Sequence, residues 1–96
     1  MKVIFAPRAL RDLEAIAAYL AERSPTDQKS VLGAIKASIG DLEQFPRIGI
    51  PIDTEGRYRL PVRRYPYLVY YRVTASELFI LHIRHGAREP IDPSVL

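Results

Sequence analysis

Apolar residues in the first half of the chain recur every three or four positions, which is the period of an α-helix. This spacing predicts two helices, over residues 7–23 and 27–45. A Ser-Pro pair at 24–25 separates them, because the residue before proline avoids helical angles, and Thr26 or Asp27 is expected to cap the second helix. Helices joined by so short a connection pack as antiparallel neighbours. The predicted apolar stripes are Leu10, Leu13, Ile16, Ala17 and Leu20 on the first helix, and Val31, Leu32, Ile35, Ile39 and Leu42 on the second.

In the second half of the chain apolar and polar residues alternate, which is typical of β-strands. The predicted strands cover residues 57–62, 67–73 and 77–85, with a short strand at 2–6 before the first helix. Residues 46–57 are rich in proline and glycine and predict a loop, and the tail at 90–96 is expected to be loose. The order is β-α-α-β-β-β. We therefore expect one α+β domain over residues 1–96, in which an antiparallel helical hairpin packs on one face of a mainly antiparallel twisted sheet.

Composition excludes several classes of protein. The chain has 96 residues and no cysteine, which excludes a disulfide scaffold, a thiolate metal site and a thiol nucleophile. Because His82 and His85 are the two histidines, no metal site is predicted, and no cofactor is predicted either. No apolar run is long enough to span a membrane, and charged residues follow the first methionine too soon for a signal peptide. We therefore expect a cytoplasmic protein without a membrane partner.

The formal net charge of +3 is unevenly distributed along the chain. Residues 1–45 carry equal numbers of acidic and basic groups, whereas residues 57–88 contain seven arginines and one acidic residue, Glu77. Arginine recognises carboxylates and phosphates through its planar, bidentate guanidinium group. An acidic protein tail, a nucleic acid or a nucleotide-bearing complex is therefore a natural partner, and a scattered basic surface is the alternative.

Strand alternation places several of these arginines on the sheet face that points away from the helices, provided that Tyr71, Leu81 and Ile83 face the helices. The residues then expected on the outward face are Arg59, Arg72, Arg84, Tyr70 and His82. Arginines among aromatic residues suit RNA or another polyanion, and they suit an acidic peptide equally well, so the pattern does not choose between these partners. The sequence shows no phosphate-binding loop and no Ser/His/Asp pattern.

Three small residues, Gly33, Ala37 and Gly40, lie together on the second predicted helix, opposite its apolar stripe. Glycine inside a helix costs about 1 kcal/mol relative to alanine. Two glycines on one face therefore suggest that another backbone approaches closely there. That backbone belongs either to the first helix or to a helix of a partner, and a surface helix of low stability is the third interpretation.

Three segments of the chain resemble the RelE/ParE superfamily of toxins from bacterial toxin–antitoxin pairs. They are FAPRALRDLEAIAAYLAE at 5–22, YRLPVRRYPYLVYYRV at 58–73 and ILHIRHGARE at 80–89. The hydrophobic-Tyr-Arg ending of the middle strand and the HGAR turn are the most specific parts of the resemblance. The order of elements also matches over nearly the whole chain, so the resemblance implies the α+β fold predicted above and the function of a toxin.

The superfamily divides by function. RelE-like members cut messenger RNA on the ribosome, and ParE-like members poison DNA gyrase by binding. The residues that a ribonuclease would use here are Arg59, Arg63, His85 and Arg88. The residues that replace members of the ribonuclease pattern are Pro61, Leu68 and Ser94. These replacements remove charge stabilisation and a proton-transfer group. The resemblance therefore favours a ParE-like toxin that is not an enzyme, and the alternatives are a ribosome-dependent RNA endonuclease and a degenerate, non-toxic antitoxin binder.

The ParE-like resemblance also implies partners. It implies a ParD-like, ribbon-helix-helix antitoxin whose acidic tail wraps the toxin in a hetero-oligomer, and it implies DNA gyrase as the target. The residues expected to bind the target are Arg59, Arg63, Arg72, Arg84 and Arg88. The residues expected to bind the antitoxin are Gly33, Ala37, Gly40, Tyr70 and His82.

Overall fold

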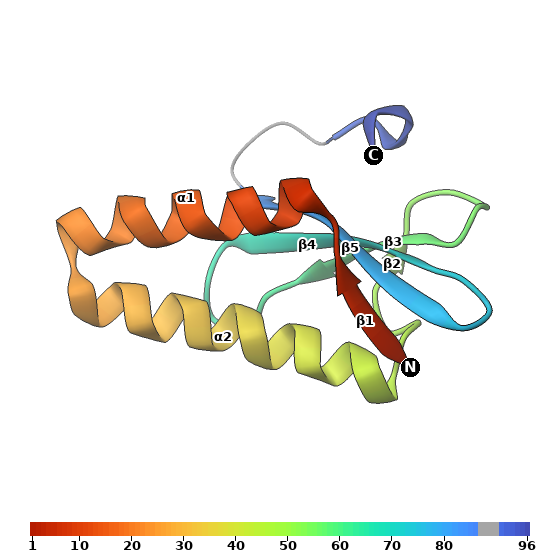
Figure 1. The fold of residues 1–96 in the computed structure, drawn as a ribbon, viewed down its shortest axis with the longest axis horizontal. Coiled ribbons are helices and arrows are strands. Elements are labelled where there is room, and N and C mark those ends of the chain that lie inside the picture. The colour runs from red at the N-terminus through yellow and green to blue at the C-terminus, as the bar shows by residue number, and fades with distance from the viewer. Residues whose placement is uncertain (87–90) are drawn as a thin grey trace.

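A five-stranded sheet forms the centre of the molecule, and two helices and a C-terminal segment lie against it (Figure 1). The computed structural model describes residues 1–86 and 91–96. The elements in chain order are β1 (Lys2–Phe5), α1 (Pro7–Arg23), α2 (Pro25–Gln44), β2 (Ile50–Pro51), β3 (Arg57–Pro61), β4 (Tyr67–Val73), β5 (Glu77–His85) and a 3₁₀-helix, η1 (Pro93–Val95). The predicted α+β class is confirmed, with β2 as an added strand.

The helical hairpin forms where the sequence predicts it, and α1 ends at Arg23. The second helix begins earlier than predicted, at Pro25, because Ser24 is its N-cap. The hydroxyl of Ser24 accepts a hydrogen bond from the amide of Asp27 at 3.2 Å. The predicted caps, Thr26 and Asp27, therefore lie inside the first turn. Proline is acceptable at the first helical position because no amide donor is needed there.

The strands follow the order β1-β5-β4-β3-β2 across the sheet. β1 is parallel to β5 and the other neighbouring strands are antiparallel, so the sheet is mainly antiparallel, as predicted. β4 and β5 have the predicted bounds, and β1 and β3 each end one residue earlier than predicted. β2 lies in the segment predicted as a loop. Its two residues, one of them proline, are too few to show an alternating pattern.

A β-bulge changes which side chains of β5 face the helices. Tyr71 pairs with Ile80 and Tyr70 pairs with His82, so Leu81 is the extra residue of β5. Leu81 is predicted to face the helices, but it lies outside the core, whereas Ile80 and Tyr71 are fully buried within it. Strict alternation cannot locate this residue, because a bulge shifts the period of two by one position.

The buried face of α1 also differs from its predicted stripe. Ala9 is fully buried, whereas Leu10, the first predicted member of the stripe, is 48% exposed. Leu13, Ile16 and Leu20 pack against the core but are only partly buried. On α2 the prediction holds better. The buried residues of α2 that the sequence predicts are Val31, Ile35, Ile39 and Leu42.

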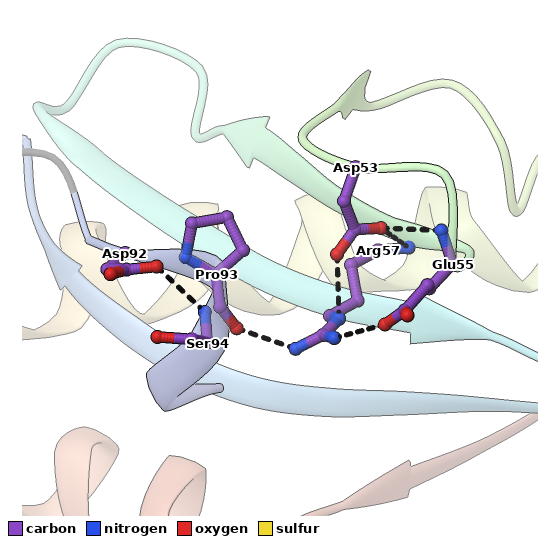
Figure 2. Close-up of polar contacts among 6 residues, drawn as sticks. All are labelled: Asp53, Glu55, Arg57, Asp92, Pro93 and Ser94. Atoms are coloured by element: carbon purple, nitrogen blue, oxygen red, sulfur yellow. Dashed lines mark hydrogen bonds and ion pairs between the residues drawn. The ribbon is translucent and has the colours of Figure 1, made fainter.

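The C-terminal segment, which the sequence predicts to be loose, forms the single turn η1 on the face of the sheet opposite α2 (Figures 1 and 2). Arg57 of β3 holds this turn, since its Nη1 donates a hydrogen bond to the carbonyl of Pro93 at 2.6 Å. Asp92 caps the turn by accepting a hydrogen bond from the amide of Ser94 at 2.9 Å. The segment therefore covers part of the sheet face that carries the arginines.

Candidate functional site

Three rows of side chains cross the face of the sheet that points away from α2, here called the outer face. Cross-strand partners point to the same side of a sheet. The rows that β3, β4 and β5 form in register are Arg57, Arg72 and Phe79; Arg59, Tyr70 and His82; and Pro61, Leu68 and Arg84. Arg59, Arg72 and Arg84 therefore share the outer face with Tyr70 and His82, as strand alternation predicts.

The centre of the outer face is closed to a partner. Tyr70 is 2% exposed and His82 is 7% exposed, and their rings are stacked with centroids 6.0 Å apart. Arg72 is exposed, and Arg59 and Arg84 are half-buried beside them. The burial of Tyr70 and His82 argues against their expected role in binding an antitoxin. The accessible part of the outer face is the set of arginines around this pair.

His82 connects the outer face to α1. Its Nδ1 lies 2.5 Å from Oδ2 of Asp12, and the same oxygen accepts a hydrogen bond from the amide of Ile83 at 2.9 Å. A carboxylate accepts and does not donate, so Nδ1 carries the proton, and Nε2 is the acceptor for Nη2 of Arg8 at 3.4 Å. Burial lowers the pKa of His82 and outweighs the opposing effect of Asp12. The imidazole is therefore neutral at pH 7.

Arg57 is an outer-face arginine whose charge the chain itself neutralises (Figure 2). Its Nε lies 2.8 Å from Oδ2 of Asp53, and its Nη2 donates to Oε2 of Glu55 at 2.6 Å. The remaining terminal nitrogen binds the carbonyl of Pro93. Asp53 also accepts a hydrogen bond from the amide of Glu55 at 2.8 Å, so the loop before β3 is folded around the guanidinium group. Arg57 is therefore a structural residue and not a free cation.

Arg63 lies apart from the outer-face arginines. Together with Arg64 it occupies the exposed turn between β3 and β4, where both residues line a hollow of about 440 Å³ against α2. Ala37 lines the same hollow from α2. Arg64 has a φ of 74°, a left-handed backbone conformation that is uncommon for a residue with a side chain. Arg63 is expected to act with Arg59, but the structure places the two on different sides of the sheet.

His85, at the end of β5, faces the same side of the sheet as Tyr67, its cross-strand partner. The two rings meet edge to face, with centroids 5.2 Å apart, and Tyr67 packs against the core. Arg88 lies outside the described residues. Of the four residues that a ribonuclease would use, three are described, and Arg59, Arg63 and His85 do not converge on one surface.

An apolar groove of about 670 Å³ lies between α1, α2 and β1. Its apolar lining residues are Val3, Phe5, Leu13, Ala17, Leu32, Ile35, Ile39 and Gly40. Three charged residues, Glu14, Lys36 and Glu43, also line it. An amphipathic helix with a stripe of apolar anchors is the kind of segment that such a groove accepts.

The sequence does not predict this groove. The feature of the sequence that could have indicated it is the width of the apolar stripe on α2. Leu32 and Ile39 lie beside Ile35, so the stripe is wider than packing against the sheet alone requires. A sequence pattern shows which residues are apolar. It does not show that α1 and β1 leave part of that stripe uncovered.

The small residues of α2 do not form the single docking face that the sequence suggests. A side-chain carbon at Gly33 or Gly40 would meet nothing within 4 Å, so the interpretation that the first helix approaches this face is wrong. Gly40 opens onto the apolar groove, whereas Ala37 lines the hollow beside the β3–β4 turn. Gly33 is exposed and lines neither. Gly40 is thus the member of the set that borders the groove.

Comparison with known proteins gives the family. The model of a family described as "ParE toxin of type II toxin-antitoxin system, parDE" matches residues 3–90. The chain belongs to the ParE toxin family. This ParE-family chain is 31% identical over 87 residues to Toxin RelE2 of Caulobacter vibrioides, and the match covers 91% of this chain and 97% of the relative.

Solved structures show the same fold. A chain from the chromosomal ParDE toxin–antitoxin system of P. aeruginosa matches this ParE-family chain with a TM-score of 0.75 and 26% identity, covering 88% of this chain and 95% of that one. A chain from the intact E. coli RelBE toxin–antitoxin complex matches with a TM-score of 0.63 and 18% identity, covering 91% of this chain and 98% of that one. The second likeness shows the fold alone.

The structure adds one observation about membranes. Within residues 1–86 and 91–96, neither helix combines the length and the apolar character needed to cross a bilayer.

Proposed function

We propose that this ParE-family protein is a toxin that acts on DNA gyrase by binding and does not cleave RNA. The observation that carries this proposal is the dispersal of the ribonuclease candidates. Arg59 lies on the outer face, whereas Arg63 and His85 lie on the opposite side of the sheet, which faces α2. Phosphodiester cleavage needs a charge-stabilising group and a proton-transfer group at one phosphate.

A second observation supports binding over cleavage. Pro61 and Leu68 replace basic residues of the ribonuclease pattern, and they are direct cross-strand partners on the outer face. Two positions that would hold adjacent cations in a ribonuclease therefore carry neighbouring uncharged side chains. The developing charge of a cleavage transition state would lack those two cations.

The outer face still offers a positive surface to a protein target. Among residues 1–86 and 91–96, Arg59, Arg72 and Arg84 form no ion pair. Such charges steer a partner with an acidic surface and fix its orientation. We assign target binding to these three arginines. Arg63 lies on the other side of the sheet, against α2, and is not part of this surface.

The apolar groove is our proposed docking site for the antitoxin. ParDE of P. aeruginosa is a toxin–antitoxin system, and an antitoxin partner is proposed here on that likeness. The apolar side of an amphipathic antitoxin segment would fill the groove beside Gly40, and an acidic tail would reach the outer-face arginines. A segment that orders on binding can cover both surfaces, because it is extended before it binds.

Expression of the protein in bacteria without antitoxin tests the proposed target. Two readouts are taken from the same culture: supercoiling of a reporter plasmid by gyrase, and integrity of a translated reporter mRNA. Loss of supercoiling with intact mRNA supports gyrase as the target. Cleaved mRNA with normal supercoiling would replace the proposal by a ribosome-dependent endonuclease, and unaffected growth would leave a non-toxic antitoxin binder.

A further inference from the structure

The side chain of Asp12 replaces a strand at the edge of β5. β1 pairs with β5 only as far as Phe5 and Ile80, after which the chain turns into α1. Further along β5, the backbone amide of Ile83 donates a hydrogen bond to Oδ2 of Asp12, a residue of α1, at 2.9 Å. The same oxygen accepts a hydrogen bond from Nδ1 of His82 at 2.5 Å. One carboxylate oxygen thus ties the first half of α1 to two groups of β5.

The arrangement around His82 depends on its protonation. Asp12 on α1 accepts from Nδ1, and Arg8 on the same helix donates to Nε2. Arg84 on β5 is a second cation near the ring, and Tyr70 on β4 stacks on it. A proton on Nε2 removes the acceptor that Arg8 uses. It also places a positive charge near two guanidinium groups, in a position that is nearly closed to water.

We propose that His82 is a pH-sensitive contact between α1 and β5: the neutral ring binds both Asp12 and Arg8, and protonation of Nε2 replaces the Arg8 contact by repulsion and loosens α1. Geometry carries this proposal, because both ring nitrogens are engaged in opposite roles and the ring is 7% exposed. The depressed pKa of His82, caused mainly by burial, has the matching direction.

Loosening of α1 would reach the apolar groove. Leu13 directly follows Asp12 and lines the groove, as does Ala17 one turn further along α1. The contact between His82 and α1 therefore affects the position of one wall of the groove. The contact between His82 and α1 lies within the chain itself and is the same whatever its target or antitoxin.

Acid should destabilise the folded chain through His82, because the folded state binds the proton of His82 less readily than the unfolded state does. The unfolded chain takes up a proton on His82 near pH 6.5, whereas the folded chain resists it to lower pH. Stability is therefore complete above about pH 6.5 and decreases as the pH falls below that value. Carboxylates also titrate in acid, so the effect of His82 has to be isolated by substitution.

The two histidines of the chain make the test direct. NMR titration of the wild-type protein follows the imidazole signals of His82 and His85, which His82→Gln and His85→Gln assign. We expect the His82 signal to titrate below pH 6.5. Thermal unfolding at pH 7.5 and 5.5 is then compared between variants. The wild type and His85→Gln should lose several degrees more than His82→Gln on acidification.

Amide exchange tests the link to the groove. At pH 5.5, after correction for intrinsic exchange, Leu13 and Ala17 should exchange severalfold faster in the wild type than in His82→Gln. A His82 signal that titrates at or above pH 6.5 would contradict the proposed role of His82. Equal acid sensitivity of the wild type and His82→Gln would contradict it too. If His82→Gln fails to fold, the wild-type titration still decides. Normal protection of Leu13 and Ala17 at pH 5.5 in the wild type would also contradict the proposal.

Discussion

The outer face of the sheet and the apolar groove differ in how far the chain itself occupies them. On the outer face Arg57 is held by Asp53, Glu55 and the C-terminal segment, and Tyr70 and His82 are buried. The groove has a volume of about 670 Å³ and is lined mainly by apolar side chains. Charge along the sequence points to the first surface. No excess of basic residues in the sequence marks the groove, yet the groove is the surface with open apolar volume for a partner.

The largest expected effect is at Gly49, which packs directly against Tyr71. A side-chain carbon at Gly49 would lie 2.6 Å from the hydroxyl of Tyr71, which is fully buried and accepts a hydrogen bond from the Gly49 amide. Gly49→Ala should therefore lower the free energy of unfolding by about 2–4 kcal/mol in urea denaturation. Gly33→Ala is the control and should raise stability by up to about 1 kcal/mol. A loss below about 1 kcal/mol for Gly49→Ala would show that Tyr71 moves more freely than its burial implies.

A leucine at the groove should have the next largest effect. Gly40→Leu adds a side chain that borders the groove, and Gly33→Leu adds the same side chain to α2 outside it. Both changes favour the helix, by about 1 kcal/mol. Gly40→Leu should weaken antitoxin binding by about 2 kcal/mol, or roughly 30-fold, in calorimetry, whereas Gly33→Leu should stay within about threefold of the wild type. Equal affinities for the two variants would remove the groove as the docking site.

The helices, β4 and β5 could be predicted from the sequence because their patterns are long. Val31, Ile35 and Leu42 are spaced so that only a helix buries all three together. β2 was not predictable, since two residues carry no period. The cap of α2 was missed because Thr26 and Asp27 are equally good caps, and the choice of Ser24 depends on Pro25 being accepted at the first helical position.

The candidate site was predictable only in part. Alternation placed Arg59, Arg72 and Arg84 correctly on the outer face, because β3 and β4 carry no extra residue and Arg84 lies on the same side of the bulge as Ile83. Burial of His82 depends on Asp12, which lies 70 positions away in the sequence, so no local pattern reveals it. The groove arises in the same way from the relative placement of three elements that are separate in the sequence.

A smaller effect is expected where the outer face is covered. Arg57→Ala removes the hydrogen bond to Pro93 and the two acidic contacts that orient it. Amide exchange in Ser94 and Val95 should become severalfold faster, while exchange in the buried strand β4 should not change. Arg11→Ala, which removes an exposed arginine of α1, is the control. If the C-terminal amides exchange equally fast in both variants, Arg57 does not hold the segment.

The smallest effect on stability is expected at the exposed part of the outer face. Arg72 is exposed and forms no ion pair among the described residues. Arg72→Ala should change the free energy of unfolding by less than about 0.5 kcal/mol, measured in urea. Because Arg72 belongs to the proposed target surface, the same variant should inhibit gyrase less than the wild type at equal concentration. Full inhibition by Arg72→Ala would exclude this arginine from target binding.

Growth of bacteria that express the protein together with its cognate antitoxin tests the division between the two surfaces most directly. The wild type and Gly33→Leu should both be neutralised, so the cells should grow. Gly40→Leu leaves the outer face unchanged and blocks the groove, so it should arrest growth despite the antitoxin. Growth of the Gly40→Leu cells at the wild-type rate, with the variant shown to be toxic when expressed alone, would contradict the account.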